Sequence, residues 1–130
     1  MEELLEYREG GFDYAVVRLG RNSDGQLPGE VFGTLRVAAS DLATPGTVLC
    51  LIQHPNGLPK KIHAGPLRDN MAGRITYATL DSLGGSSGSP ILGPDGRIVG
   101  VHTNGGCDPI GGFNSGVAIG VIKQVSDAVP

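Results

Sequence analysis

Short apolar runs alternate with polar or glycine-rich turns along most of the chain, a pattern typical of β-strands. Downstream of Gly46 lie six such runs, at residues 47–53, 59–66, 73–79, 89–93, 97–103 and 114–120. Upstream, Phe12 to Leu19 is rich in β-branched and aromatic residues, which predicts a strand with one acidic residue at its start. Val31 to Ala38 is a further candidate strand, and the apolar spacing of Val121 to Ala128 predicts a short terminal helix.

The segments between these runs have the composition of turns and loops. In Gly93-Pro94-Asp95-Gly96, a proline and an Asp-Gly pair stand between two apolar runs, which predicts a hairpin. Residues 20–30 form a polar loop, and residues 39–45 form a connector. Leu4 to Arg8 has weak helical spacing before Gly10-Gly11, so we expect only a short lead-in there.

The composition favours one all-β domain. A chain of 130 residues with 39% hydrophobic content is large enough to build a single core. The 22 glycines and 9 prolines are dispersed between the apolar runs, as frequent turns between short strands require. The fold class is therefore a β-sandwich or β-barrel, and six successive runs match the strand count of a small closed barrel.

Charge and cysteine content narrow the possible functions. The net charge of −3, without a basic stripe or an aromatic platform for bases, gives no reason to expect nucleic-acid binding. Cys50 and Cys107 are too few for a disulfide framework and lack zinc or redox spacing, so two free thiols or one bridge remain open. The N-terminal residues lack a signal-peptide-like stretch and no later segment could span a bilayer, which favours a soluble cytoplasmic protein.

A glycine- and serine-rich turn carries the candidate chemistry. The run Gly84-Gly85-Ser86-Ser87-Gly88-Ser89-Pro90 leads into a strand-like Ile91-Leu92. Its glycines let the backbone bend sharply and bring N–H groups close to a reacting atom, as an oxyanion hole requires. Ser87 is therefore the candidate nucleophile, and it needs a hydrogen-bonded base, usually a histidine that a carboxylate orients. No Gly-Lys-Ser/Thr arrangement follows, which argues against a phosphate loop and leaves a flexible turn as the alternative.

These residues resemble the trypsin-like, chymotrypsin-fold serine peptidases, in particular their bacterial members, and the resemblance covers most of the chain. Gly85 to Pro90 is similar to the Gly-x-Ser-Gly-x-Pro signature of that family, and Asp13 to Leu19 looks like the segment that supplies the triad aspartate. Four more segments resemble the opening hairpin of the second barrel and the two strands of the specificity pocket: Cys50–Pro55, Lys60–Gly65, Val99–His102 and Asn114–Ile119.

The resemblance implies a role for each residue of the turn. Ser87 would attack the substrate carbonyl, and the N–H groups of Gly85 and Ser87 would hold the oxyanion. Asp13 would orient the base, although a capping aspartate at the start of a strand is the alternative. Ser86 stands where animal trypsins have an aspartate that pairs with a newly cut N-terminus, so we do not expect activation through that ion pair.

The resemblance also implies a specificity pocket, formed by Asp81 and Ser82 at its base, His102 on its wall and Gly116 on a lining strand. An aspartate at the base favours substrates with arginine or lysine before the scissile bond. His102 with Ser82 instead resembles the glutamyl endopeptidases, which bind a substrate carboxylate. Asp81 paired with His102 would neutralise the site, so acidic and basic preferences both stay open, as does a structural role for His102.

The base histidine is missing from the position where this family has it. The family places it well upstream of the triad aspartate, on the first barrel, and the residues that precede Asp13 contain no histidine. His54, His63 and His102 lie on segments that resemble the second barrel, and we interpret each as structural. Recruitment of one of them as the base would require the fold to aim it at Ser87 Oγ.

We therefore predict a six-stranded antiparallel barrel of the trypsin-like fold with a short C-terminal helix. Residues 1–38 would be a remnant of the first barrel that carries Asp13, and residues 39–130 the second barrel with Ser87 and the pocket.

The expected function is that of a serine endopeptidase without metal or cofactor, whose base lies outside these residues, so the chain alone would lack full activity. The alternative is a catalytically inactive trypsin-fold module that binds peptides or proteins. The expected partners are a peptide or protein substrate, and an N-terminal segment or homo-oligomer that covers the incomplete first barrel.

Overall fold

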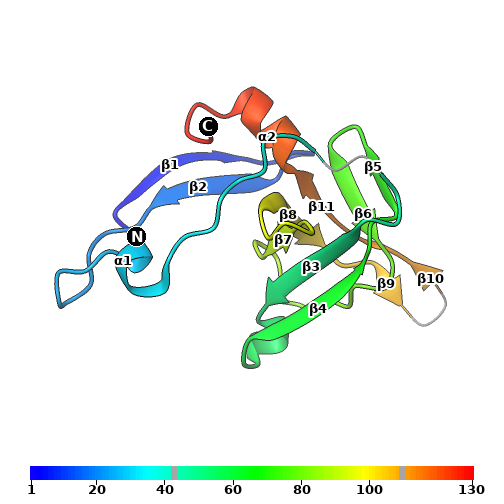
Figure 1. Ribbon diagram of the computed structural model, residues 1–130, viewed down its shortest axis with the longest axis horizontal. Coiled ribbons are helices and arrows are strands. Elements are labelled where there is room, and N and C mark those ends of the chain that lie inside the picture. Colours follow the sequence, from blue (N-terminus) through cyan, green and yellow to red (C-terminus); the bar gives the residue numbers. More distant parts are fainter. Residues whose placement is uncertain (42–43, 109–110) are drawn as a thin grey trace.

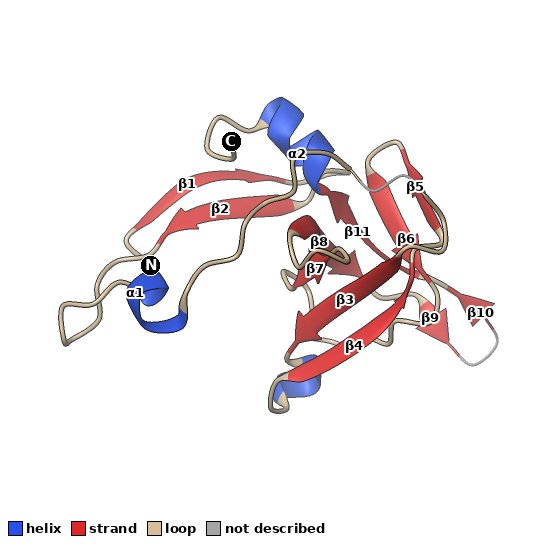
Figure 2. Ribbon diagram, viewed as in Figure 1, coloured by secondary structure: helices blue, strands red, loops and turns tan. Residues whose placement is uncertain are grey.

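The computed structural model describes residues 1–41, 44–108 and 111–130. Seven strands form one antiparallel sheet in the order β4-β3-β7-β8-β11-β6-β5 (Figures 1 and 2). These strands are β3 (Val48–Gln53), β4 (Lys61–Pro66), β5 (Asp69–Met71), β6 (Arg74–Tyr77), β7 (Pro90–Leu92), β8 (Ile98–Asn104) and β11 (Asn114–Ala118). The predicted all-β class is confirmed, and each of the six predicted runs contains one strand of this sheet. The short strand β5 was not predicted.

The sheet curls because its two edge strands, β4 and β5, are consecutive in the chain. Leu67 N–H donates to Thr47 O over 2.7 Å on the β3 side, and Arg68 N–H donates to Thr76 O over 2.8 Å on the β6 side. One connector therefore joins both ends of the strand order. In β3, side chains alternate between solvent and interior, which places Leu49 and Leu51 in the core.

The hairpin predicted at residues 93–96 joins β7 to β8. Gly93 N–H donates to Arg97 O over 2.9 Å, and Gly96 N–H donates to Gly93 O over 3.0 Å. The Asp95 carboxylate accepts a hydrogen bond from Arg97 N–H and so fixes the turn. A second hairpin pairs two very short strands that were not predicted, β9 (Cys107–Asp108) and β10 (Gly111–Gly112).

The N-terminal residues form a separate hairpin of β1 (Glu3–Arg8) and β2 (Tyr14–Arg18). The strand predicted at residues 12–19 is present as β2, whereas the expected lead-in at residues 4–8 is strand β1. Its weak local pattern is overridden by pairing with β2 at every residue except Leu5, where the register shifts.

The strand predicted at residues 31–38 is wrong. Residues 31–32 instead end a short helix, α1 (Pro28–Phe32), which begins at a proline. The Glu30 carboxylate accepts a hydrogen bond from Leu27 N–H over 2.7 Å, and Gly33, with φ of 76°, ends the helix. Farther along, Val37 forms only an isolated parallel bridge with Ile98 of β8.

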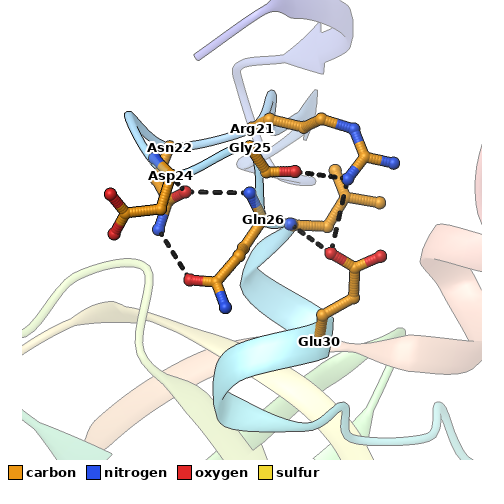
Figure 3. A network of polar contacts seen from close by, with 7 residues as sticks. Arg21, Asn22, Asp24, Gly25, Gln26 and Glu30 are labelled. Carbon is orange, nitrogen blue, oxygen red and sulfur yellow. Dashed lines mark hydrogen bonds and ion pairs between the residues drawn. The ribbon is translucent and has the colours of Figure 1, made fainter.

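The predicted polar loop at residues 20–30 is ordered by local hydrogen bonds (Figure 3). Asn22 Oδ1 accepts hydrogen bonds from the N–H groups of Asp24 and Gln26, over 3.0 and 2.9 Å. Arg21 Nη1 donates to Gly25 O over 2.6 Å and also contacts the Glu30 carboxylate at 3.4 Å. These contacts join the loop to α1, which lies at the end of the molecule away from the seven-stranded sheet (Figure 1).

The predicted terminal helix is α2 (Ile119–Val125), which begins two residues earlier than expected. Ile119 and Ile122 are buried against the sheet. None of the helices in the described residues has the length and apolar character needed to cross a membrane.

Three side chains attach the β1–β2 hairpin to the C-terminal end of the chain. Tyr14 is buried in the same core as Ile119 and Ile122. Arg8 Nη2 donates to Val125 O over 2.8 Å, at the end of α2. The Glu6 carboxylate accepts a hydrogen bond from Asp127 N–H over 3.3 Å. The hairpin consequently lies alongside α2 (Figure 1).

The carboxyl group of Glu6 gives this attachment a pH dependence. The side chain of Ser126 hydrogen bonds to it and, helped by Tyr14, Asp127 N–H and Arg8, holds the pKa of Glu6 below its usual value of 4.5 although desolvation opposes the shift. A lowered carboxyl pKa stabilises the folded state at pH above 4.5. That contribution is lost as the pH falls through the folded-state pKa.

We therefore expect Glu6→Gln to lower the free energy of unfolding at neutral pH, and this difference from wild type should shrink as the pH falls well below 4.5. Urea unfolding across a pH series measures it, with the exposed Glu2→Gln as the matched control. A Glu6→Gln effect that is constant with pH would contradict this role for the carboxylate.

Candidate active site

Ser87 lies on an exposed turn that leads into β7. Three backbone hydrogen bonds fix the turn, from Ser86 N–H to Leu83 O, Ser89 N–H to Ser86 O and Gly88 N–H to His102 O. Ser87 Oγ itself donates to Thr103 O of β8 over 3.1 Å. The candidate nucleophile is therefore held beside β8, with a carbonyl as its partner.

Two backbone amides beside Ser87 Oγ are available as oxyanion donors. Within the described part of the chain, neither Gly85 N–H nor Ser87 N–H has a hydrogen-bond acceptor. Gly85 has a φ of +88°, a conformation that residues with a Cβ rarely adopt. The carbonyl of the preceding residue, Gly84, accepts a hydrogen bond from Asn56 N–H over 2.7 Å. The turn at residues 55–57 therefore contacts and fixes the turn that carries Ser87.

Asn56 was missed as a site residue by the sequence analysis. It has a left-handed φ of 52° at the centre of a short 3₁₀ turn, Pro55–Gly57. The Asn56-Gly57 pair is a local turn signal. Its contact with Gly84, however, joins residues 28 positions apart, and no local pattern indicates that partner.

Asp13 and Ser87 line one cleft of about 440 Å³, between the β1–β2 hairpin and the sheet. Asp13 directly precedes β2, whereas Ser87 belongs to the turn before β7. Arg8 and Glu9 also line this cleft from the hairpin. Among the described residues, His102 is the one histidine in its lining, and His102 Nδ1 already contacts Tyr77 in the core.

The other two histidines make structural contacts away from this cleft. His54 Nδ1 lies 3.1 Å from Leu58 O across the 55–57 turn. His63 Nδ1, on β4, accepts a hydrogen bond from Asp81 N–H over 2.9 Å. Neither residue lines the cleft that holds Ser87. No group of three or more His, Cys, Asp or Glu side chains within the described residues could hold a metal ion.

A second cavity, of about 450 Å³, adjoins Ser87 and contains two of the predicted pocket residues, Ser82 and His102. It is lined by Ser82, Leu83, Gly84, Ser87, His102 and the Gly105-Gly106 pair. Ser82 Oγ is buried there and has no partner among the described residues. The structure thus brings Ser82 and His102 together, as the resemblance implied.

Asp81 does not line this pocket. Gln53 Nε2 donates to Asp81 O over 2.7 Å and His63 accepts from Asp81 N–H, and these bonds hold the backbone with the carboxylate turned outward. The Asp81 side chain is 86% exposed, and its Oδ2 lies 4.0 Å from His63 Nδ1. The alternative in which Asp81 pairs with His102 is therefore not what the structure shows.

Gly116 lies on β11, directly opposite His102 on β8. A Cβ at Gly116 would stand 2.3 Å from Val101 O, so only glycine allows these two strands to approach so closely. Gly116 is absent from the lining of this pocket. Ser86, next to the nucleophile, is fully buried, and its Oγ has no partner among the described residues.

The wall of the pocket contains a buried polar pair. His102 is 2% exposed, and its Nδ1 lies 2.5 Å from the hydroxyl of Tyr77, which is 0% exposed. Burial lowers the pKa of His102, although a hydrogen bond to the backbone of Ser115 acts in the opposite direction. Burial also raises the pKa of Tyr77. At neutral pH the pair is therefore an uncharged imidazole and a protonated phenol.

The thiol of Cys50 is free and half-buried on β3, and the side chain of Cys107 lies outside the described part of the structure.

Comparison with known families agrees with this geometry. Residues 2–101 match the model of the trypsin-like peptidase domain. This chain belongs to the trypsin-like peptidase family. The resemblance inferred from the serine turn and the aspartate segment is thereby confirmed.

Two relatives extend the comparison. The chain is 36% identical over 116 residues to Secreted RxLR effector protein 73 of Plasmopara viticola. This alignment covers 79% of the chain and 27% of that protein. In structure it is similar to a Glu endopeptidase solved in complex with MPD, with a TM-score of 0.59 and 25% identity over 69% of this chain and 43% of that one. The chain thus spans about a quarter of the first relative and less than half of the second.

The positive φ of Gly85 can be tested by comparing alanine substitutions at Gly85 and at its neighbour Gly84, whose φ is not positive. We expect Gly85→Ala to destabilise the folded chain by about 1–2 kcal/mol, because alanine is strained in the left-handed conformation. Gly84→Ala should be close to neutral, since its new Cβ would meet Asn56 Oδ1 at an ordinary 3.5 Å. Urea unfolding of both variants measures the difference. Equal effects of the two substitutions would contradict the turn geometry described above.

Proposed function

We propose that this chain is the C-terminal catalytic portion of a serine endopeptidase, whose base histidine is supplied by polypeptide outside these 130 residues. The observation that carries the proposal is the single cleft lined by both Asp13 and Ser87. Membership of the trypsin-like family supports the same reading. In this proposal, residues 1–38 are the remnant of a first barrel and residues 39–130 form the second.

In the proposed reaction, Ser87 Oγ attacks the carbonyl carbon of the scissile peptide bond while the imported histidine takes its proton. The N–H groups of Gly85 and Ser87 donate to the oxyanion, and removal of one such donor typically costs about 3 kcal/mol of transition-state stabilisation. The histidine then protonates the leaving amine, and an acyl-enzyme forms on Ser87. Water, deprotonated by the same histidine, hydrolyses this ester and regenerates the Ser87 hydroxyl.

Asp13 has the role of orienting the imported imidazole and stabilising its protonated form. It is exposed to the cleft, and the described residues give its carboxylate no ion-pair partner. The carboxylate is therefore available to a ring that enters the cleft between the hairpin and the sheet.

The surface of the N-terminal part supports a covering polypeptide. Leu4, Tyr7, Val17, Leu19 and Phe32 are exposed apolar side chains of this part of the chain, and Phe32 is 86% exposed. The two-stranded sheet β1–β2 has no further strand on either side within the described residues. Open edges and apolar surface are typical sites of pairing with another segment. We propose that an N-terminal segment of a longer chain covers this face and also carries the histidine.

The groups that line the pocket favour substrates with an acidic residue immediately before the scissile bond. Ser82 and His102 provide hydrogen-bonding groups in the pocket, while the competing carboxylate of Asp81 points away from it. The structurally similar protein is described as a Glu endopeptidase, which agrees with this preference.

The alternative function is that of an inactive trypsin-fold module that binds peptides in the same cleft. Its support is the hydrogen bond of Ser87 Oγ to Thr103 O, which leaves the nucleophile without a base among the described residues. The relative from Plasmopara viticola is described as an effector, a term that does not imply proteolysis.

A fluorophosphonate probe followed by intact-mass measurement distinguishes the two functions. We expect slow labelling of this chain alone. Fusion behind a histidine-bearing first-barrel segment of a longer family member should accelerate labelling by about 10²- to 10⁴-fold, the usual contribution of a general base. Ser87→Ala should abolish labelling in both preparations, whereas the matched Ser89→Ala should retain it. Absence of labelling in both preparations would favour the binding module.

A further inference from the structure

The buried contact between Tyr77 and His102 is the feature of the pocket that the proposed reaction does not use. Tyr77 ends β6 and His102 lies on β8, so β11 separates their two strands in the sheet. Their ring centroids are 5.9 Å apart, with an angle of 41° between the ring planes. The side chains meet through one polar contact, between the Tyr77 hydroxyl and His102 Nδ1.

We propose that Tyr77 is a positioning residue of the specificity pocket, which holds the His102 ring through Nδ1 and thereby presents Nε2 to the acidic side chain of a peptide. This inference rests on the proposed acidic preference of the same pocket. Tyr77 is absent from the pocket lining, so it acts through His102 without touching the substrate.

The hydrogen-bonding capacity of the two groups determines how the ring is held. A neutral imidazole has one N–H group and one acceptor nitrogen, and a tyrosine hydroxyl can donate and accept. The Tyr77 hydroxyl has no other partner among the described residues, so accepting from Nδ1–H would leave its own proton unsatisfied in the core. Such a buried unsatisfied group costs about 1–3 kcal/mol. Tyr77 therefore donates to Nδ1, and the ring carries its proton on Nε2.

The same hydroxyl also supports a charged imidazole. When a substrate carboxylate enters the pocket, its negative charge favours protonation of His102. The additional proton is then on Nδ1, and the Tyr77 hydroxyl rotates to accept from it. Its own proton then lacks a partner, a cost that the attraction between the imidazolium and the substrate carboxylate has to exceed. Proton uptake thus accompanies binding of an acidic side chain, without leaving a buried N–H group unsatisfied.

Few charged groups compete with this coupling. The polar groups that face His102 or share its two cavities are Tyr77, the Ser115 backbone, Ser82, Ser87, Thr103, and Tyr7, Arg8, Glu9, Asp13 and Tyr14 across the cleft. Arg74 of β6 donates to Ser115 Oγ on the neighbouring strand. Asp81 is engaged with His63 outside the pocket. Tyr77 is therefore the one side chain with a direct hydrogen bond to the ring among the described residues.

The test is a binding measurement, so it does not require an active enzyme. Two short peptides, acetylated and amidated at their ends, carry Glu or Gln at the recognised position, and the glutamate carboxylate is then the only charge that distinguishes them. Titrations followed by nuclear magnetic resonance give both affinities, and the ¹⁵N signals of the His102 ring report its tautomer. For the wild-type chain we expect an acceptor Nδ1 in the free state and tighter binding of the Glu peptide. The preference for Glu should increase as the pH falls from about 8 to about 6.

In Tyr77→Phe, the preference for Glu over Gln should fall by about tenfold or more, as expected for loss of a buried hydrogen bond to a charged group. Its pH dependence should be lost, and the His102 ring should no longer show a single tautomer. The matched control is Ile75→Val, a conservative change in the core on the same strand, β6, which should retain both the preference and the tautomer.

Three outcomes would overturn the inference. A Tyr77→Phe chain that keeps the Glu preference and its pH dependence would exclude the positioning role of Tyr77. A proton on Nδ1 of the free wild-type ring would contradict the assigned donor. Equal or absent binding of both peptides to the wild-type chain would remove the acidic preference on which the inference rests. Labelling of Ser87 by the fluorophosphonate probe does not depend on any of these three results. The proposed peptidase function is therefore tested separately from the role of Tyr77.

Discussion

The attachment of the β1–β2 hairpin to the C-terminal helix is the contact on which the candidate active site depends. Asp13 directly precedes β2, whereas Ser87 lies on the turn that leads into the seven-stranded sheet, and among the described residues no strand pairing connects the hairpin to that sheet. Burial of Tyr14 and the hydrogen bond from Arg8 to Val125 O hold the hairpin against α2. A two-stranded hairpin is at best marginally stable alone, so these contacts keep the carboxylate and the nucleophile on one cleft.

Within the sheet, the pocket depends on which polar groups are buried and which remain in solvent. His102 and Tyr77 are buried as a hydrogen-bonded pair, which avoids the cost of an isolated polar group in the core. Asp81 has no such partner in the interior, and its backbone bonds to Gln53 and His63 keep its carboxylate outside. The pocket therefore presents an imidazole and a hydroxyl without a competing negative charge.

Much of this arrangement is encoded locally and could be predicted from the sequence. The alternating runs identified all strands of the sheet except β5, whose three residues are too few to form a pattern. The serine turn and the aspartate that directly precedes β2 are local motifs, so the sequence alone predicted Ser87 and Asp13 as site residues, and the structure places both on one cleft. Helix α1 was missed although Pro28 and Glu30 are local start signals, because the apolar residues from Val31 onward outweighed them.

The parts that were missed depend on partners distant in sequence. Strand β1 exists because β2 pairs with it, and the outward turn of Asp81 results from His63, 18 residues away. Tyr77 gave no sign of its role, since its contact with His102 spans 25 residues and a tyrosine in a strand is ordinary core composition.

The central claim is that this chain holds a serine nucleophile and its orienting aspartate on a cleft that lacks only the imidazole. Free imidazole added to the chain tests this most directly, with fluorophosphonate labelling of Ser87 as the readout, since the cleft of about 440 Å³ has room for such a ring. The account predicts that imidazole accelerates labelling of the wild-type chain, that Asp13→Asn reduces this acceleration, and that Ser87→Ala shows no labelling. A labelling rate that does not change with imidazole, or an equal acceleration in the Asp13→Asn chain, would contradict it.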